Sequence, residues 1–222
     1  MDENLKKTIM LRMEKTAENL RKNNMEAYIA DNSAEAVKIV ESILKEGESI
    51  SCGGSVTLKE SGVMDLMKSG KYNFLDRSKA KTQEEIEAVY RQVFSCDTYL
   101  TSANAVTENG ELYNVDGNSN RVAAICYGPK SVIFVVGMNK LVRNIDEAVV
   151  RVKNCAAPPN CIRLDCKTPC RETGECISLS TGGDMPSGCH SEARICCNYV
   201  VSAHQRHKNR FKVILVAESL GY

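Results

Sequence analysis

Residues 26–57, EAYIADNSAEAVKIVESILKEGESISCGGSVT, predict a strand, a helix and a second strand in succession. The run at 26–30 is typical of a short strand, and Asn32 with Glu35 three positions later is typical of a helix start. The run at 48–51 predicts the next strand, which continues directly into a glycine pair. Because a strand–helix–strand unit joins two parallel strands, this stretch predicts an α/β fold.

The same alternation extends outward from this unit. Residues 4–23 carry apolar side chains at helical spacing, and Thr82 with Glu85 predicts another helix start. The Asn109-Gly110 pair predicts an antiparallel hairpin within residues 106–113. We expect further helices at 57–68 and after Asn144, and further strands at 72–75, 97–101, 122–127, 131–136 and 211–217. The predicted fold class is therefore α/β, with a doubly wound, mostly parallel sheet.

Composition excludes several classes of function. The 222 residues include 29 Lys and Arg against 28 Asp and Glu, and no Trp, so neither a basic surface nor a base-stacking platform for nucleic acid is expected. No apolar run approaches the roughly 20 residues of a membrane span. The charged N-terminal stretch does not resemble a secretory signal. We therefore expect a cytoplasmic protein that binds neither nucleic acid nor a membrane.

Cysteines are concentrated near the C-terminus. Eight of the eleven fall between Cys155 and Cys197, and clusters of this kind in a reducing compartment are more often metal-binding or catalytic than disulfide-bonded. The polar, glycine- and proline-rich chain around them cannot pack a core alone, so a bound metal is expected to order it. We divide the chain into an α/β core, residues 1–154 plus 211–222, and a cysteine-rich segment, residues 155–210.

The favoured occupant of this segment is an iron–sulfur cluster of the [4Fe-4S] type, which takes up to four thiolates. The proposed ligands are Cys170, Cys176, Cys189 and Cys196. Structural zinc, bound by four thiolates or by three with His190, is an alternative, and free structural thiols are another. The remaining cysteines of the segment are spare or alternative ligands: Cys155, Cys161, Cys166 and Cys197.

The glycine pair after the second strand is a candidate anion site. Gly53 and Gly54 free backbone N–H groups at the start of the next helix, and Ser55 and Thr57 can add hydroxyl contacts to a phosphate or carboxylate. A tight turn with Ser55 as the helix cap explains the same residues without a ligand. The motif is much weaker than a complete phosphate-binding loop.

A second group of polar residues lies between residues 101 and 121. Asn104 follows a predicted strand, at the end of a sheet where α/β proteins bind ligands. Glu108 can serve as a base or a nucleophilic carboxylate, and Arg121 can bind an anion bidentately. Asp116 and Asn120 complete the proposed ligand-binding set, although Asn-Gly and Asp-Gly also occur as simple turns.

These motifs together resemble the lactate-utilization (LUD) domain family. The resemblance rests on SCGGSVTLKESG, on NVDGNSNRVAAICYGP followed by VVGMNKLV, and on the tail motifs KTPCRETGEC, RICC and VILVAESLGY. It implies a fold similar to the ribose-phosphate isomerase, glucosamine-phosphate deaminase and CoA-transferase superfamily. Some members have a tail with the pattern TPC-x5-Cys-x2-Cys-x6-Cys. Here Cys170, Cys176 and Cys196 match it, whereas twelve residues separate Cys176 from Cys189.

The resemblance implies a role in lactate utilization or redox metabolism. The first hypothesis is a protein that binds a small anionic ligand and a C-terminal iron–sulfur cluster, alongside iron–sulfur oxidoreductase subunits. The second is a group-transfer or isomerase-type enzyme in which Glu108 is the nucleophile or base. The third is a sensor or scaffold subunit with a structural zinc.

Overall fold

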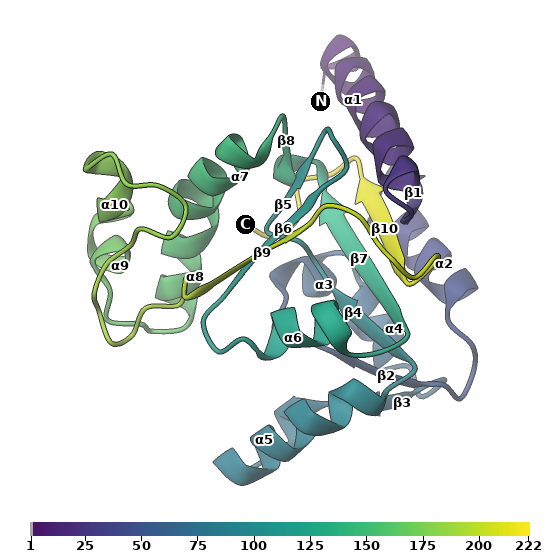
Figure 1. Cartoon of the computed structure of the whole chain (residues 1–222). Helices are drawn as coiled ribbons and strands as arrows, with labels where there is room; N and C mark the ends of the chain where they lie inside the picture. The colour runs from purple at the N-terminus through teal and green to yellow at the C-terminus, as the bar shows by residue number, and fades with distance from the viewer. Residues whose placement is uncertain (1) are drawn as a thin grey trace.

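The computed structural model describes residues 2–222, which fold around a six-stranded sheet and a smaller four-stranded sheet (Figure 1). All neighbouring strands of the large sheet run parallel. Their order across the sheet is β1 (Glu26–Ala30), β10 (Phe211–Val216), β7 (Ser131–Gly137), β4 (Thr98–Thr101), β2 (Ser49–Cys52) and β3 (Asn73–Leu75). The predicted α/β class and its mostly parallel sheet are confirmed.

Helices cover both faces of this sheet. Side chains alternate between faces along each strand, so Phe134 of β7 joins one apolar core and Ile133 joins the other. The first core contains residues of α1 (Glu3–Lys22) and α6 (Asn120–Tyr127). The second contains residues of α2 (Ser33–Ile43), α3 (Val56–Glu60) and α4 (Val63–Met67). Among residues 2–222, no helix combines the length and apolarity that a membrane crossing requires.

The predicted helix starts are confirmed at atomic detail. The Asn32 side chain accepts a hydrogen bond from the Glu35 N–H at the start of α2. Thr82 and Glu85 form a reciprocal capping box at the start of α5 (Gln83–Gln92). The Asn144 side chain caps α7 (Ile145–Arg151) by accepting a hydrogen bond from the Glu147 N–H. Each cap satisfies N–H groups that the helix itself cannot pair.

The smaller sheet contains the predicted hairpin. Strands β5 (Ala105–Thr107) and β6 (Leu112–Asp116) pair antiparallel around Asn109-Gly110. Strand β8 (Leu141–Val142) joins β5, and β9 (Asn198–Ser202) joins β6. The cysteine-rich segment is thus attached to the core through β9, which runs beside β6 in Figure 1.

Two predicted elements were wrong. The run at 122–127 is part of helix α6 and not a strand, because the Asp116 carboxylate caps the N–H groups of Arg121 and Val122. A short apolar run is compatible with either a buried helix or a buried strand, and only the cap distinguishes them here. The single helix expected at 57–68 is two short helices, because Gly62 adopts a left-handed conformation between α3 and α4.

The cysteine-rich segment contains several short helices. Residues 152–156 form a π-helical turn that continues into α8 (Ala157–Arg163). Two further helices follow, α9 (Pro169–Thr173) and α10 (Ile177–Ser180). In Figure 1 these helices extend to one side of the molecule, away from α1.

Candidate functional site

A cavity of about 310 Å³ opens beyond the carboxyl ends of β2 and β4. All eight residues that the sequence suggested for ligand binding line it: Gly53, Gly54, Ser55, Thr57, Asn104, Asp116, Asn120 and Arg121. They come from two stretches separated by nearly fifty positions along the chain. Parallel strands bring their carboxyl ends to one edge of the sheet, which is where α/β proteins bind ligands.

The glycine pair forms one wall of the cavity. A Cβ on Gly53 would lie 2.8 Å from the Tyr99 hydroxyl, and a Cβ on Gly54 would lie 2.7 Å from an Arg77 Nη2. Ser55 caps α3, since its hydroxyl accepts a hydrogen bond from the Leu58 N–H at 3.2 Å. The absence of side chains therefore lets the loop pack directly against the Tyr99 hydroxyl and the Arg77 guanidinium.

Asp116 has a structural role in the cavity wall. Its carboxylate accepts hydrogen bonds from the backbone N–H groups of Asn118, Arg121 and Val122, at 3.0–3.2 Å. Its negative charge is thereby engaged at the start of α6, where it stabilises the helix. Asp116 therefore contributes little uncompensated negative charge to the cavity.

Arg121 is anchored on all sides by the protein. Its Nη1 donates to Asn114 Oδ1 at 2.7 Å and to the Ser102 carbonyl at 3.4 Å. Its Nη2 donates to Asn104 Oδ1 at 2.9 Å and to the Val115 carbonyl at 2.6 Å. Burial lowers the pKa of this guanidinium from its ordinary value. Arg121 thus holds the hairpin against β4, and its terminal nitrogens are directed at protein acceptors.

Lys140 is a buried amine that the sequence reasoning did not select. It lies in the 3₁₀ turn that follows β7, and its Nζ donates to Thr57 Oγ1 at 2.7 Å and Ser102 Oγ at 3.1 Å. Burial, reinforced by the positive charges of Arg151 and Arg121, lowers the pKa of Lys140 to about 7. Lysines with strongly lowered pKa values in clefts are characteristic of functional sites.

Two more cations line the cavity, Arg77 from the turn after β3 and Arg163 from α8. The Arg77 Nη1 donates to the Tyr90 hydroxyl at 2.7 Å, and its guanidinium lies over the Tyr90 ring. Arg163 of α8 donates to Asn160 Oδ1 through Nε and Nη2. Each guanidinium keeps further N–H groups for a ligand, since arginine has five donors.

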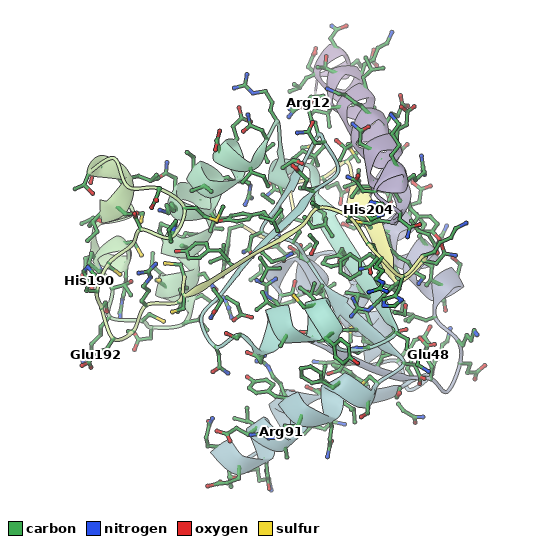
Figure 2. All side chains as sticks on the ribbon, in the orientation of Figure 1. Arg12, Glu48, Arg91, His190, Glu192 and His204 are labelled. Atoms are coloured by element: carbon green, nitrogen blue, oxygen red, sulfur yellow. The ribbon has the colours of Figure 1, made fainter. Side chains whose placement is uncertain are left out.

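Glu108 lies outside the cavity. Its carboxylate accepts hydrogen bonds from Arg12 Nε at 2.7 Å and Lys15 Nζ at 3.1 Å, both on α1. Burial opposes its ionisation, but these two partners hold the pKa of Glu108 below its ordinary value. Figure 2 shows Arg12 on α1 near the hairpin tip. The structure therefore does not bring Glu108 together with the other predicted site residues.

The four proposed cluster ligands are not gathered either. Among residues 2–222, no group of three or more Cys, His, Asp or Glu side chains is arranged to hold a metal ion. All eleven cysteines are free thiols, and the Sγ atoms of Cys161 and Cys170 lie 3.6 Å apart. His190 lies at the outer edge of this segment (Figure 2). The thiol donors suit an iron–sulfur cluster chemically, whereas their arrangement does not form its four-ligand site.

Most of the residues that sequence reasoning missed share one signal. Lys140 follows β7 almost immediately, and Ser102 follows β4 directly. The rule that ligands bind at the carboxyl ends of strands selected Asn104 and applies equally to both residues. The same rule applies to Arg77, which lies two residues after β3, whereas Arg163 carried no comparable signal, because only the packing of α8 directs it to the cavity.

Comparisons with known proteins give one sequence family and a similar solved fold. A sequence model of the LUD domain matches residues 13–216. A crystal structure of a DUF162 family protein from Deinococcus radiodurans is similar with a TM-score of 0.51 and 12% sequence identity. The similarity covers 96% of this chain and 98% of that chain, and it concerns the fold alone. No curated protein matches the chain.

Proposed function

The chain belongs to the LUD domain family, and from that premise we propose that it binds a small organic anion in the cavity beside the glycine pair. The ligand class is a short-chain carboxylate, with L-lactate and pyruvate as the first candidates. The proposal links the protein to lactate utilization and redox metabolism, as the family resemblance implies.

The charge balance of the cavity carries this proposal. Among the described residues that line it, the basic side chains are Arg77, Arg121, Lys140 and Arg163, whereas Asp116 is the single acidic side chain. Asp116 is engaged by three backbone N–H groups, so its charge offsets the arginines only partly. A partly enclosed positive site attracts an anion more strongly than the same charges would in water.

The size of the cavity supports a small ligand. Drug-sized ligands occupy cavities of roughly 300–1,000 Å³, and this one, at about 310 Å³, is at the lower end. The hydroxyls of Ser55 and Ser102 add neutral polar groups to its wall. A carboxylate of a few carbon atoms, with one further oxygen, suits both the volume and the chemistry.

Calorimetric titration with L-lactate, pyruvate, acetate and phosphate tests the proposal. We expect binding of at least one carboxylate, and we expect Arg77→Gln to weaken it about tenfold, because a charge-assisted hydrogen bond contributes roughly 1.5–3 kcal/mol. Arg91→Gln is the matched control, since Arg91 is exposed on the neighbouring helix α5 and does not line the cavity. The proposal fails if wild-type protein binds none of the four anions, or if the two variants bind equally well.

An iron–sulfur cluster at Cys170, Cys176, Cys189 and Cys196 remains a separate proposal, supported by the thiolate donor set and the tail pattern. Iron–sulfur oxidoreductase subunits are the partners that such a cluster would serve. Anaerobic purification with iron, sulfide and zinc analysis tests it. We expect iron and sulfide in equal amounts, reduced by Cys196→Ser and unchanged by Cys126→Ser. Zinc without iron would favour the structural alternative, and a metal-free protein would overturn both.

A further inference from the structure

Lys140 differs from the other buried lysine of the chain in what surrounds its amine. Both are nearly inaccessible, with Lys140 3% and Lys153 2% exposed. The Lys153 Nζ donates to Ser178 Oγ and to the carbonyls of Asp184 and Ser187, which occupies all three of its protons. Within residues 2–222, the Lys140 Nζ has only the hydroxyls of Thr57 and Ser102 as partners, and it lines the cavity.

The charged groups around Lys140 disfavour its ammonium form. Arg121 of α6 and Arg151 of α7 are the neighbouring cations, and Glu60 at the end of α3 is the neighbouring carboxylate. Glu60 Oε2 accepts a hydrogen bond from the Gly221 N–H, and no ion pair joins it to Lys140 among the described residues. Burial and the two arginines lower the pKa of Lys140 to about 7, so a neutral amine is well populated at neutral pH.

A neutral lysine amine at the edge of a cationic cavity has a specific chemical capacity. Amines add to aldehyde and ketone carbons, and lysines are activated for this reaction by a desolvated site and by neighbouring cations. A ligand whose anionic group is bound by Arg77 or Arg163 would present any adjacent carbonyl to the same cavity. Holding the two reactants together removes much of the entropic barrier to the addition.

We propose that Lys140 forms a reversible imine with a small carbonyl compound that carries an anionic group, such as a 2-oxo carboxylate. This inference rests on the proposed function of the cavity as an anion site, and it adds the reacting group. The Nζ lone pair attacks the carbonyl carbon and forms the C–N bond. Both protons of the neutral amine then leave with the carbonyl oxygen as one water molecule, and hydrolysis reverses the step.

Thr57 and Ser102 are the positioning residues of this reaction. Both hydroxyl oxygens are hydrogen-bonded to the Nζ. The Thr57 hydroxyl donates its own hydrogen bond to the Leu220 carbonyl, and the Ser102 hydroxyl donates to the Ala103 carbonyl. Their oxygens therefore accept from the amine, which aligns its N–H bonds and leaves its remaining position for the ligand. No oxidant, reductant or cofactor is needed for the step.

Reductive trapping tests the proposal directly. Full-length protein is incubated with pyruvate or with dihydroxyacetone phosphate in the presence of cyanoborohydride, and the modified lysine is located by peptide mass spectrometry. We expect a secondary-amine adduct on Lys140, with pyruvate if the anion is a carboxylate and with the sugar phosphate if it is a phosphate. Complete loss of this adduct is expected in Lys140→Arg, because arginine stays protonated and does not form imines under these conditions.

The control is Lys212→Arg. Lys212 is also partly buried with a pKa lowered mainly by burial, but it lies on β10 outside the cavity, so its replacement should leave the Lys140 adduct unchanged. In wild-type protein, excess L-lactate, which lacks a carbonyl at the reacting carbon, should compete and suppress trapping without relying on any variant. Calorimetric binding of pyruvate without an adduct on Lys140 would overturn the imine and leave the anion site intact. Absence of both binding and adduct would overturn both.

Discussion

The cavity and the cysteine-rich segment are two polar regions of one chain, and they are organised in opposite ways. Residues of the cavity come from distant positions but are fixed by the ends of the parallel strands. The cysteines are close in sequence but are carried by short helices and loops, and they do not converge in the described residues. Proximity along the chain is therefore a poor guide to a site unless the backbone between its residues is held by packing.

Each region depends on one cationic side chain that is hydrogen-bonded to several protein acceptors. Arg121 joins four acceptors of the hairpin and of β4 in the cavity wall. Lys153 reaches from the π-helical turn to the loop at 184–187 and so connects the cysteine-rich segment to the core. The comparison predicts that loss of Arg121 destabilises the whole fold, whereas loss of Lys153 releases only the segment.

The largest effect is expected for Arg121→Met. This change leaves the carbonyl of Val115 and the side-chain oxygen of Asn114 buried without their donor. Each unsatisfied buried group costs roughly 1–3 kcal/mol, so we expect the free energy of unfolding to fall by about 3 kcal/mol. Urea denaturation measures it, with the exposed Arg91→Met as the control. A loss below about 1 kcal/mol would mean that the hairpin does not depend on this guanidinium.

A smaller and local effect is expected for Lys153→Met. Its removal leaves the carbonyls of Asp184 and Ser187 without their donor. We expect the free energy of opening the loop that carries them to fall by about 2 kcal/mol. Hydrogen exchange should accelerate in residues 177–190 and stay unchanged in β7 and β10. The exposed Lys167→Met is the control. Equal acceleration in the central strands would show that the segment and the core unfold together.

The third expected effect is a pH dependence contributed by Lys140. Its pKa falls from 10.5 to about 7 on folding, so the unfolded chain binds more protons between these two pH values. The free energy of unfolding therefore rises with pH across this window, by up to about 1.4 kcal/mol per pH unit. Below the window, the destabilisation caused by the lowered pKa of Lys140 is fully present. Lys140→Met should remove this slope in urea denaturation at a series of pH values. Parallel curves for wild type and variant would show that Lys140 remains charged when folded.

The smallest effect is expected for Glu108→Gln, outside both regions. The side chains of its partners Arg12 and Lys15 are 42% and 61% exposed, and ion pairs to exposed partners contribute about 0–1 kcal/mol. We expect a loss of stability below about 1 kcal/mol and unchanged binding of carboxylates to the cavity. Calorimetric titration of the variant measures the second point. A marked loss of ligand turnover or binding would favour the group-transfer hypothesis instead.

Much of the fold was predictable because its signals are local. Asn32, Thr82 and Asn144 each mark a helix start through a side chain that caps nearby N–H groups. Asn109-Gly110 marks the hairpin through a tight turn in which Gly110 has a positive φ. The error at 122–127 arose because the cap of α6 is Asp116, several residues before the helix. Gly62 similarly divides a helix whose apolar spacing looks continuous.

The sequence by itself determined the α/β class, the helix caps and the eight proposed ligand-binding residues that line the cavity, since each depends on neighbours in the chain. The tertiary structure alone decided the roles of those residues. It directs Arg121 at protein acceptors, places Glu108 against α1, and buries Lys140 between two hydroxyls near two arginines. The physical reason is that charge, desolvation and hydrogen-bond partners depend on groups far away in sequence, which only the packing of the two sheets brings together.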